Sequence, residues 1–137
     1  MVYKMKKEDK GLRMYAGNAY ETYTQNNINI ESPVKLIEML YEGVLRFNAQ
    51  AKKAIKNGKI EERVYWTNRS VAVISELLAS LDTKQKGTVV PYLQGLYNYE
   101  IKLLLEAGLN NDEAKLDECT KVFKGLLEAW RETTNVA

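Results

Sequence analysis

Apolar residues recur at alternating intervals of three and four positions along this chain, and that spacing constrains its fold more than any other feature. Residues at these intervals lie on one side of an α-helix, whereas the residues of a strand alternate between two faces. The spacing runs through Ile37, Leu40, Val44, Phe47, Ala51 and Ala54, then through Val64, Thr67, Val71, Ile74, Leu78 and Leu81, and later through Leu116, Cys119, Phe123, Leu126 and Trp130. Each set predicts the buried side of a bundle helix.

Capping residues and helix breakers predict where the first two helices begin and end. Ser32 can cap a helix whose first residue is Pro33, because serine accepts a backbone N–H and proline suits the first helical position. Asn57-Gly58 suits the left-handed end of that helix. The second helix is expected over residues 60–81.

The boundaries of the last two helices follow from similar signals. A third helix is expected over residues 88–107, with Pro91 tolerated because it falls in the first turn. Residues 108–111 predict a break. Asn110 is followed three residues later by Glu113, which resembles a capping box at the start of a fourth helix.

Short connections between such helices force neighbouring helices to run antiparallel. The predicted fold is therefore all-α, an antiparallel up-down four-helix bundle over residues 32–133. A short N-terminal docking segment is expected at residues 15–31. Residues 1–14 are expected to be a disordered basic extension.

The docking segment is rich in alanine and tyrosine, and Tyr15, Ala16, Ala19, Tyr20 and Tyr23 would gather on one side of it. A helix this short is not stable alone, so it must dock on another surface. Burying three tyrosines contributes at most about 10–15 kcal/mol, which is close to the cost of ordering about a dozen residues. We therefore expect a displaceable plug that leaves when a longer amphipathic ligand arrives.

The composition argues against catalysis. The chain has no histidine and one cysteine, and it has no glycine-rich phosphate loop and no cysteine pair for zinc. The commonest general base is therefore missing. We expect no enzyme activity, no cofactor and no metal site, and we expect Cys119 to be a buried core residue in a reducing compartment.

The charge pattern does not favour nucleic acid or membranes as partners. The formal net charge is only +2, and residues 1–13 hold five basic and two acidic side chains, so the rest of the chain is nearly balanced. These basic N-terminal residues are the only feature that would favour nucleic-acid binding. No run approaches the ~18 apolar residues of a membrane span, and the basic N-terminal residues lack the apolar segment of a secretory signal. We expect a cytoplasmic protein without membrane insertion.

Nine tyrosines are unusual in a chain of 137 residues. Tyr65, Trp66, Tyr92 and Tyr99 lie off or at the edge of the predicted buried faces. Two interpretations remain open. The rings can pack flat on the bundle with their polar atoms in water, or they can form a surface for a partner.

The order of several segments resembles one known family, the flagellin-export chaperone FliS. The segments are SPVKLIEMLYEG (32–43), VAVISELLASLD (71–82), GLYNYEIKLLLEA (95–107) and LLEAWRE (126–132), together with the Tyr/Ala-rich opening. The resemblance covers about residues 15–133. Residues 1–14 extend beyond the usual start of the family, and Pro91 replaces its usual helix former.

The resemblance implies a cytoplasmic chaperone that binds the disordered C-terminal segment of flagellin, here called the client, in hydrophobic grooves. Binding would prevent premature polymerisation and deliver flagellin to the flagellar type III export apparatus, with the export gate as a second partner. A co-chaperone or an anti-sigma factor is left open as a further partner, and the expected state is a monomer or weak dimer. The N-terminal segment of family members is displaced by the client, which agrees with the plug.

Matching positions and the aromatic pattern together suggest the partner-binding residues. They are Leu36, Leu40, Tyr41, Tyr65, Trp66, Tyr92, Leu96, Tyr97 and Tyr99. Of the matched positions, Leu40 and Trp130 are expected to pack in the core. The alternative from another class is a non-catalytic helical bundle that dimerises as a structural or regulatory adaptor.

Overall fold

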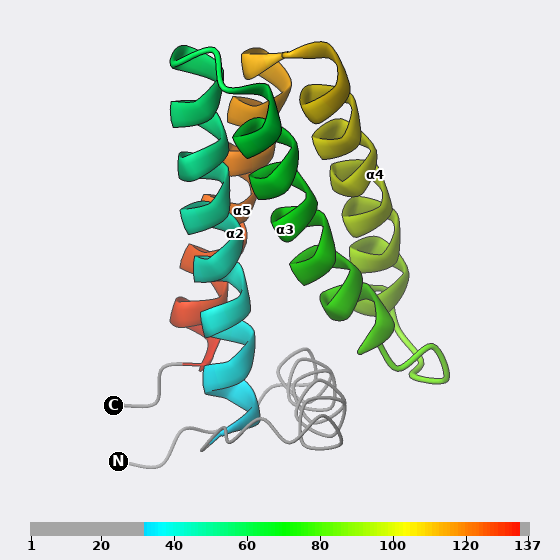
Figure 1. The fold of residues 1–137 in the computed structure, drawn as a ribbon. Helices are drawn as coiled ribbons and strands as arrows, with labels where there is room; N and C mark the ends of the chain where they lie inside the picture. Colours follow the sequence, from blue (N-terminus) through cyan, green and yellow to red (C-terminus); the bar gives the residue numbers. More distant parts are fainter. Residues whose placement is uncertain (1–31, 135–137) are drawn as a thin grey trace.

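The computed structural model describes residues 32–134, which form four α-helices and no strand (Figure 1). The helices are α2 (Pro33–Lys56), α3 (Ile60–Ala79), α4 (Val89–Asn110) and α5 (Glu113–Thr134). The predicted all-α fold is confirmed. The docking segment at 15–31 and the extension at 1–14 lie outside the described residues.

Each helix packs on two neighbours in the cyclic order α2, α3, α4, α5. Successive helices run in opposite directions, as Figure 1 shows, so the arrangement is the predicted up-down bundle. Of the neighbouring pairs, α4 and α5 pack least extensively.

The two ends of α2 follow the predicted capping chemistry. The Ser32 hydroxyl accepts a hydrogen bond from the Lys35 backbone N–H at 3.4 Å, and Pro33 is the first helical residue. At the other end Gly58 has a φ of 66°, its N–H donates to the Ile55 carbonyl, and the Lys59 N–H donates to the Ala54 carbonyl. This pair of bonds is the Schellman arrangement, which satisfies carbonyls that the helix leaves open.

The predicted break at residues 108–111 is wrong for its first three residues, because α4 continues through Gly108 to Asn110. Gly108 is glycine for another reason. A Cβ atom there would lie 2.6 Å from the Thr67 hydroxyl oxygen, so the residue permits close packing of α4 on α3. The left-handed residue that ends α4 is Asn111, with a φ of 56°.

The predicted capping box at the start of the fourth helix is also wrong, because Glu113 is the first residue of α5 and not the third. Asp112, not Asn110, accepts a hydrogen bond from the Lys115 backbone N–H, at 3.2 Å. Both residue types can cap a helix, and the extra turn of α4 moves the start of α5 by two positions.

The predicted buried face of the second helix is rotated from the observed one, and the helix ends at Ala79 instead of residue 81. Its buried residues are Thr67, Ser70, Ile74 and Leu77, whereas Val64 is 38% exposed and Val71 and Leu78 are half-buried. The apolar pattern passed over Ser70, whose hydroxyl is satisfied inside the bundle by Asn48. Smaller differences of the same kind occur elsewhere, where Asn48 and Leu127 are buried and Phe47 and Leu126 are only half-buried.

A polar layer crosses the middle of the core. Asn48 on α2 accepts a hydrogen bond from the Ser70 hydroxyl at 2.6 Å and donates one to the Thr120 hydroxyl at 3.2 Å. Cys119 is fully buried beside this asparagine, as predicted, and burial raises the pKa of its thiol. Buried polar side chains that satisfy one another in this way fix the register of packed helices.

Glu100 belongs to the same layer, but its hydrogen-bonding groups are not all satisfied. Its side chain is 1% exposed, and its Oε1 atom has no hydrogen-bond partner among residues 32–134. Burial raises the pKa of this carboxyl to about 6, the Cys119 thiol partly opposes the rise, and the negative charge of Glu118 adds to it. The layer therefore contains one group whose charge is unfavourable at neutral pH.

Candidate partner-binding groove

An apolar pocket of about 340 Å³ opens between the start of α4 and the end of α5. It is lined by Tyr41, Thr88, Val89, Tyr92, Leu93, Leu126, Ala129, Trp130 and Thr133. Tyr92 is 65% exposed, so a large aromatic ring stands at the rim in contact with water. Pockets with apolar walls and few polar groups at the edge are typical of sites that accept hydrophobic side chains.

The pocket lies at this end because the two helices are held together at the other. The short turn at Asn111 and Asp112 joins α4 directly to α5, and an ion pair between Lys115 and Glu106 links the helices beside that turn. Within residues 32–134, no turn joins the start of α4 to the end of α5. We call the whole α4–α5 side, from the ion pair to the pocket, the α4–α5 groove.

The floor of the pocket is an aromatic cluster. The Tyr41 ring meets the Trp130 ring edge-on at a centroid distance of 6.4 Å and the Phe123 ring at 5.9 Å. The hydroxyls of Tyr41 and Tyr97 are hydrogen-bonded at 2.7 Å, and the Trp130 indole N–H donates to the Val34 carbonyl at 3.0 Å. Edge-on packing and satisfied polar atoms make this floor rigid.

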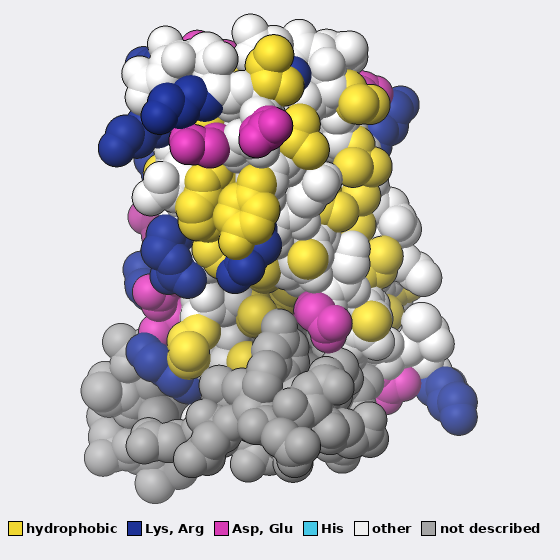
Figure 2. All heavy atoms as spheres, viewed as in Figure 1, with side chains coloured by type: hydrophobic (Ala, Val, Ile, Leu, Met, Phe, Trp, Pro, Cys, Tyr) yellow, Lys and Arg dark blue, Asp and Glu magenta, His cyan; other side chains and the backbone are white. Residues whose placement is uncertain are grey.

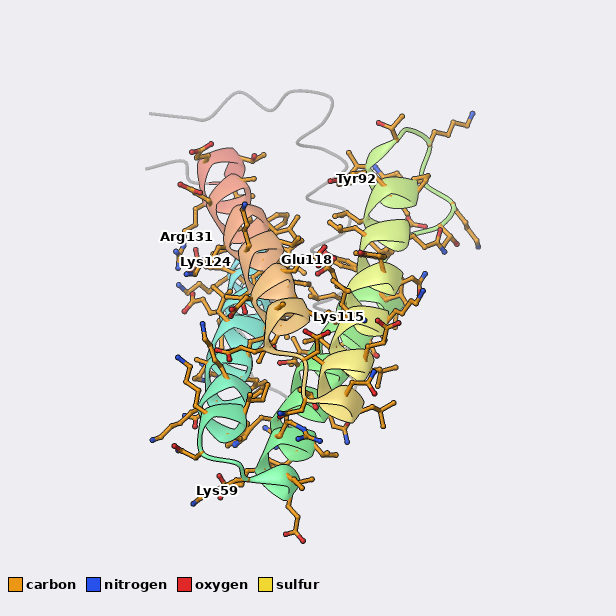
Figure 3. The ribbon with its side chains drawn as sticks, turned by 90° about the horizontal axis from the view of Figure 1, so that it is seen from above. Lys59, Tyr92, Lys115, Glu118, Lys124 and Arg131 are labelled. Carbon is orange, nitrogen blue, oxygen red and sulfur yellow. The ribbon has the colours of Figure 1, made fainter. Side chains whose placement is uncertain are left out.

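One side of α4 forms the wall of the groove. Tyr92, Leu96 and Tyr99 recur at intervals of four and three, beside the core residues of the same helix. Tyr99 is 49% exposed, and the negative charge of Glu118 on α5 is the main cause that raises the pKa of its phenol. Figure 3 shows Tyr92, Lys115 and Glu118 on the side where α4 and α5 face each other, and Lys124 and Arg131 on the opposite side of α5.

The structure divides the predicted partner-binding residues into three groups. Leu36, Leu40, Tyr41 and Tyr97 are buried in the bundle, and Tyr41 also reaches the pocket floor. Tyr92, Leu96 and Tyr99 lie along the α4–α5 groove. Tyr65 and Trp66 lie elsewhere, beside Phe47 of α2. Leu40 and Trp130, which were expected to pack in the core, are both buried. The plug residues lie outside the described part.

Several pocket residues were not predicted from the sequence. They are Val89, Leu93, Leu126 and Ala129, together with Thr88 and Thr133 at the rim. A signal for the α4 side did exist, because α4 is apolar on two adjacent sides while a bundle helix needs only one. The α5 side gave no such signal, because alanine and threonine, found here at Ala129 and Thr133, are common on any exposed helix surface.

The described residues contain no candidate metal-binding site. In the range 32–134 no three side chains of histidine, cysteine, aspartate or glutamate lie close enough together to hold a metal ion. In the same range, no helix has the length and apolar character that crossing a membrane requires.

Comparison with known proteins supports the family indicated by the segments. The family model described as "Flagellar protein FliS" matches residues 16–137. The flagellar secretion chaperone FliS of Campylobacter jejuni is 56% identical over 117 residues, covering 85% of this chain and 91% of the relative. FliSB of Pseudomonas aeruginosa is 31% identical, covering 85% and 96% of the two chains, and FliS of Salmonella typhimurium is 28% identical, covering 87% and 92%. This chain therefore belongs to the FliS family of flagellar secretion chaperones.

Proposed function

We propose that this protein is a cytoplasmic export chaperone that binds the disordered C-terminal segment of flagellin in the α4–α5 groove. By covering that segment it prevents premature polymerisation, and it delivers flagellin to the flagellar type III export apparatus. The observation that carries the proposal is the open apolar pocket with an exposed tyrosine at its rim, in a chain of this family.

The shape and chemistry of the groove favour a helical client. Its apolar end offers a rigid aromatic floor, and an amphipathic helix would place residues at intervals of three and four into such a groove. Covering the exposed part of Tyr92 alone would contribute about 2–4 kcal/mol before the entropy of ordering the client is subtracted. The far end carries Glu118 and the Lys115–Glu106 ion pair, so the occupant there should be polar.

The N-terminal segment enters the proposal as the occupant that the client displaces. Tyr15, Ala16, Ala19, Tyr20 and Tyr23 remain the predicted contacts of this plug, and their positions lie outside the described residues. The support is energetic, because docking a short segment is nearly balanced by the entropy of ordering it. A client that forms a longer helix would win such a competition.

A bulky substitution in the pocket tests the site directly. Ala129→Trp should fill the pocket and weaken binding of a labelled C-terminal flagellin segment by more than about tenfold, measured by fluorescence anisotropy. Ala49→Trp is the matched control, since Ala49 is exposed in a different depression between α2 and α5. Equal affinity of both variants and the unmodified protein would place the client elsewhere.

Sedimentation equilibrium distinguishes the chaperone from the dimerising adaptor. A chaperone should remain a monomer or weak dimer without client and form a one-to-one complex with it. An adaptor that uses the same groove should associate with increasing concentration without any client, and Ala129→Trp should abolish that association.

A further inference from the structure

A second aromatic surface lies on the α2–α3 side of the bundle, opposite the α4–α5 groove in the cyclic order of the helices. It consists of Arg46 and Phe47 on α2 and of Tyr65, Trp66 and Arg69 on α3, and we call it the cation–aromatic cluster. Figure 2 shows a hydrophobic patch near the middle of this face, with basic side chains beside it.

The rings and guanidinium groups of the cluster hold one another in place. The Phe47 and Trp66 rings are stacked at a centroid distance of 5.6 Å, and the Tyr65 ring meets Trp66 edge-on at 4.8 Å. The Arg69 guanidinium lies 5.0 Å from the centre of the Phe47 ring and donates to the Tyr65 hydroxyl at 3.2 Å. Such contacts pre-order an arginine side chain that would otherwise move freely.

The two arginines of the cluster have no acidic partner in the part of the chain that the structure describes. Neither Arg46 nor Arg69 forms a salt bridge with any residue in the range 32–134, whereas Arg131 pairs with both Glu38 and Glu42. The Arg46 guanidinium lies 5.2 Å from the centre of the same Phe47 ring. The two cations are therefore no more than about 10 Å apart, which is roughly one Debye length at 0.1 M salt. A carboxylate between them would relieve their repulsion and find two oriented donors.

We propose that the cation–aromatic cluster is a second binding surface, which takes an acidic segment of a partner protein other than the client. An aspartate or glutamate of that segment pairs with the guanidiniums of Arg46 and Arg69. An adjacent apolar side chain covers the Tyr65 ring, which is 50% exposed. Since the surface lies on the opposite side from the α4–α5 groove, the partner and the client bind at the same time.

The charges around the cluster favour a peptide over a nucleic acid. Nucleic-acid surfaces use several basic groups along a path that follows the phosphates. Here the acidic first turn of α3, which carries Glu61 and Glu62, lies about one turn before Tyr65 of the cluster on the same helix. A long polyanion would meet these carboxylates, whereas a short acidic segment can avoid them.

Peptide selection with the intact chain tests the proposal. A displayed library of random 16-residue peptides is selected on the unmodified protein and then tested on the variant carrying Arg46→Glu and Arg69→Glu. We expect enriched peptides with aspartate or glutamate next to an aromatic or leucine residue, and an affinity loss of more than about tenfold in the double variant. The matched control carries Lys121→Glu and Lys124→Glu, the same charge change on exposed residues of α5, and should bind normally.

Further measurements complete the test. Binding should change the fluorescence of Trp66, since the other tryptophan, Trp130, is buried, and it should persist when the α4–α5 groove is saturated with the flagellin segment. Circular dichroism should show that the double variant remains folded. Selected peptides that lack acidic residues, that bind the double variant equally well or that are displaced by the flagellin segment would overturn the proposal. Tighter binding of a labelled single-stranded oligonucleotide, lost in the double variant, would also overturn it in favour of a nucleic-acid surface.

Discussion

Replacing Glu100 by glutamine should stabilise the bundle at neutral pH. The Glu100 carboxyl is buried in the polar layer, one of its oxygens has no hydrogen-bond partner among the described residues, and its pKa is raised from 4.5 to about 6. The main cause is burial, which disfavours the charged form. Glutamine keeps the shape of the side chain and removes the charge.

The size of the effect follows from the pKa. A rise from 4.5 to about 6 lowers the free energy of unfolding by about 2 kcal/mol at pH 7, where the carboxyl is ionised in both the folded and the unfolded states. Between about pH 4.5 and 6 the folded protein binds more protons than the unfolded one, so stability from this residue rises as the pH falls. Glu100→Gln should therefore gain about 2 kcal/mol at pH 7, and less than half of that gain should remain at pH 5.

Urea unfolding followed by circular dichroism at pH 7 and pH 5 measures both values. Glu118→Gln is the control, because Glu118 is an exposed neighbour that contributes only a minor part of the raised pKa. That variant should change stability by less than about 0.5 kcal/mol. If the Glu100→Gln protein is no more stable than the unmodified one at pH 7 and has the same pH dependence, the buried charge of Glu100 does not destabilise the bundle.

Local geometry supports three further predictions about stability. Gly108→Ala should lower the free energy of unfolding by about 1–3 kcal/mol because its Cβ would meet the Thr67 hydroxyl; Thr67→Ala in the same chain should recover part of this loss, as thermal unfolding can show. Tyr41→Phe removes one buried hydrogen bond to Tyr97 and should cost about 1 kcal/mol, with a double-mutant cycle including Tyr97→Phe giving a non-zero coupling energy. Gly58→Ala should cost about 1 kcal/mol because alanine disfavours the positive φ of this helix end, and an equal loss in an exposed mid-helix substitution would contradict that explanation.

The fold was predictable from the sequence because its main signals are local. The spacing of apolar residues sets the number of helices, and single residues such as Ser32 and Gly58 mark where a helix starts or ends. Each of these signals depends only on residues within one or two helical turns, and such residues are close together in the sequence.

The errors arose where a residue acts through a distant contact. Gly108 looks like a helix breaker, but α4 continues through it, and its lack of a side chain makes room for Thr67 of the neighbouring helix α3. Ser70 looks like a surface residue, but Asn48 satisfies it in the core. Neither partner can be identified from spacing along one helix.

The candidate site was only partly predictable for a related reason. Tyr92 was suggested by its position off the core face, yet the pocket beside it depends on how far α4 and α5 separate at one end. Buried and exposed aromatics also look alike in a sequence, so Tyr97 and Tyr99 were grouped together although the first is fully buried and the second is about half exposed.

Flagellin binding by this bundle can be measured by calorimetric titration of the full chain with the C-terminal segment of flagellin. The same titration is made with a chain that begins at Ser32. We expect one-to-one binding with a negative heat-capacity change, and tighter binding when the N-terminal residues are removed. Equal affinity of the two forms would contradict the proposed plug but would still support flagellin binding by the bundle. An absence of binding by either form, with both folded by circular dichroism, would contradict the proposal that this bundle binds flagellin.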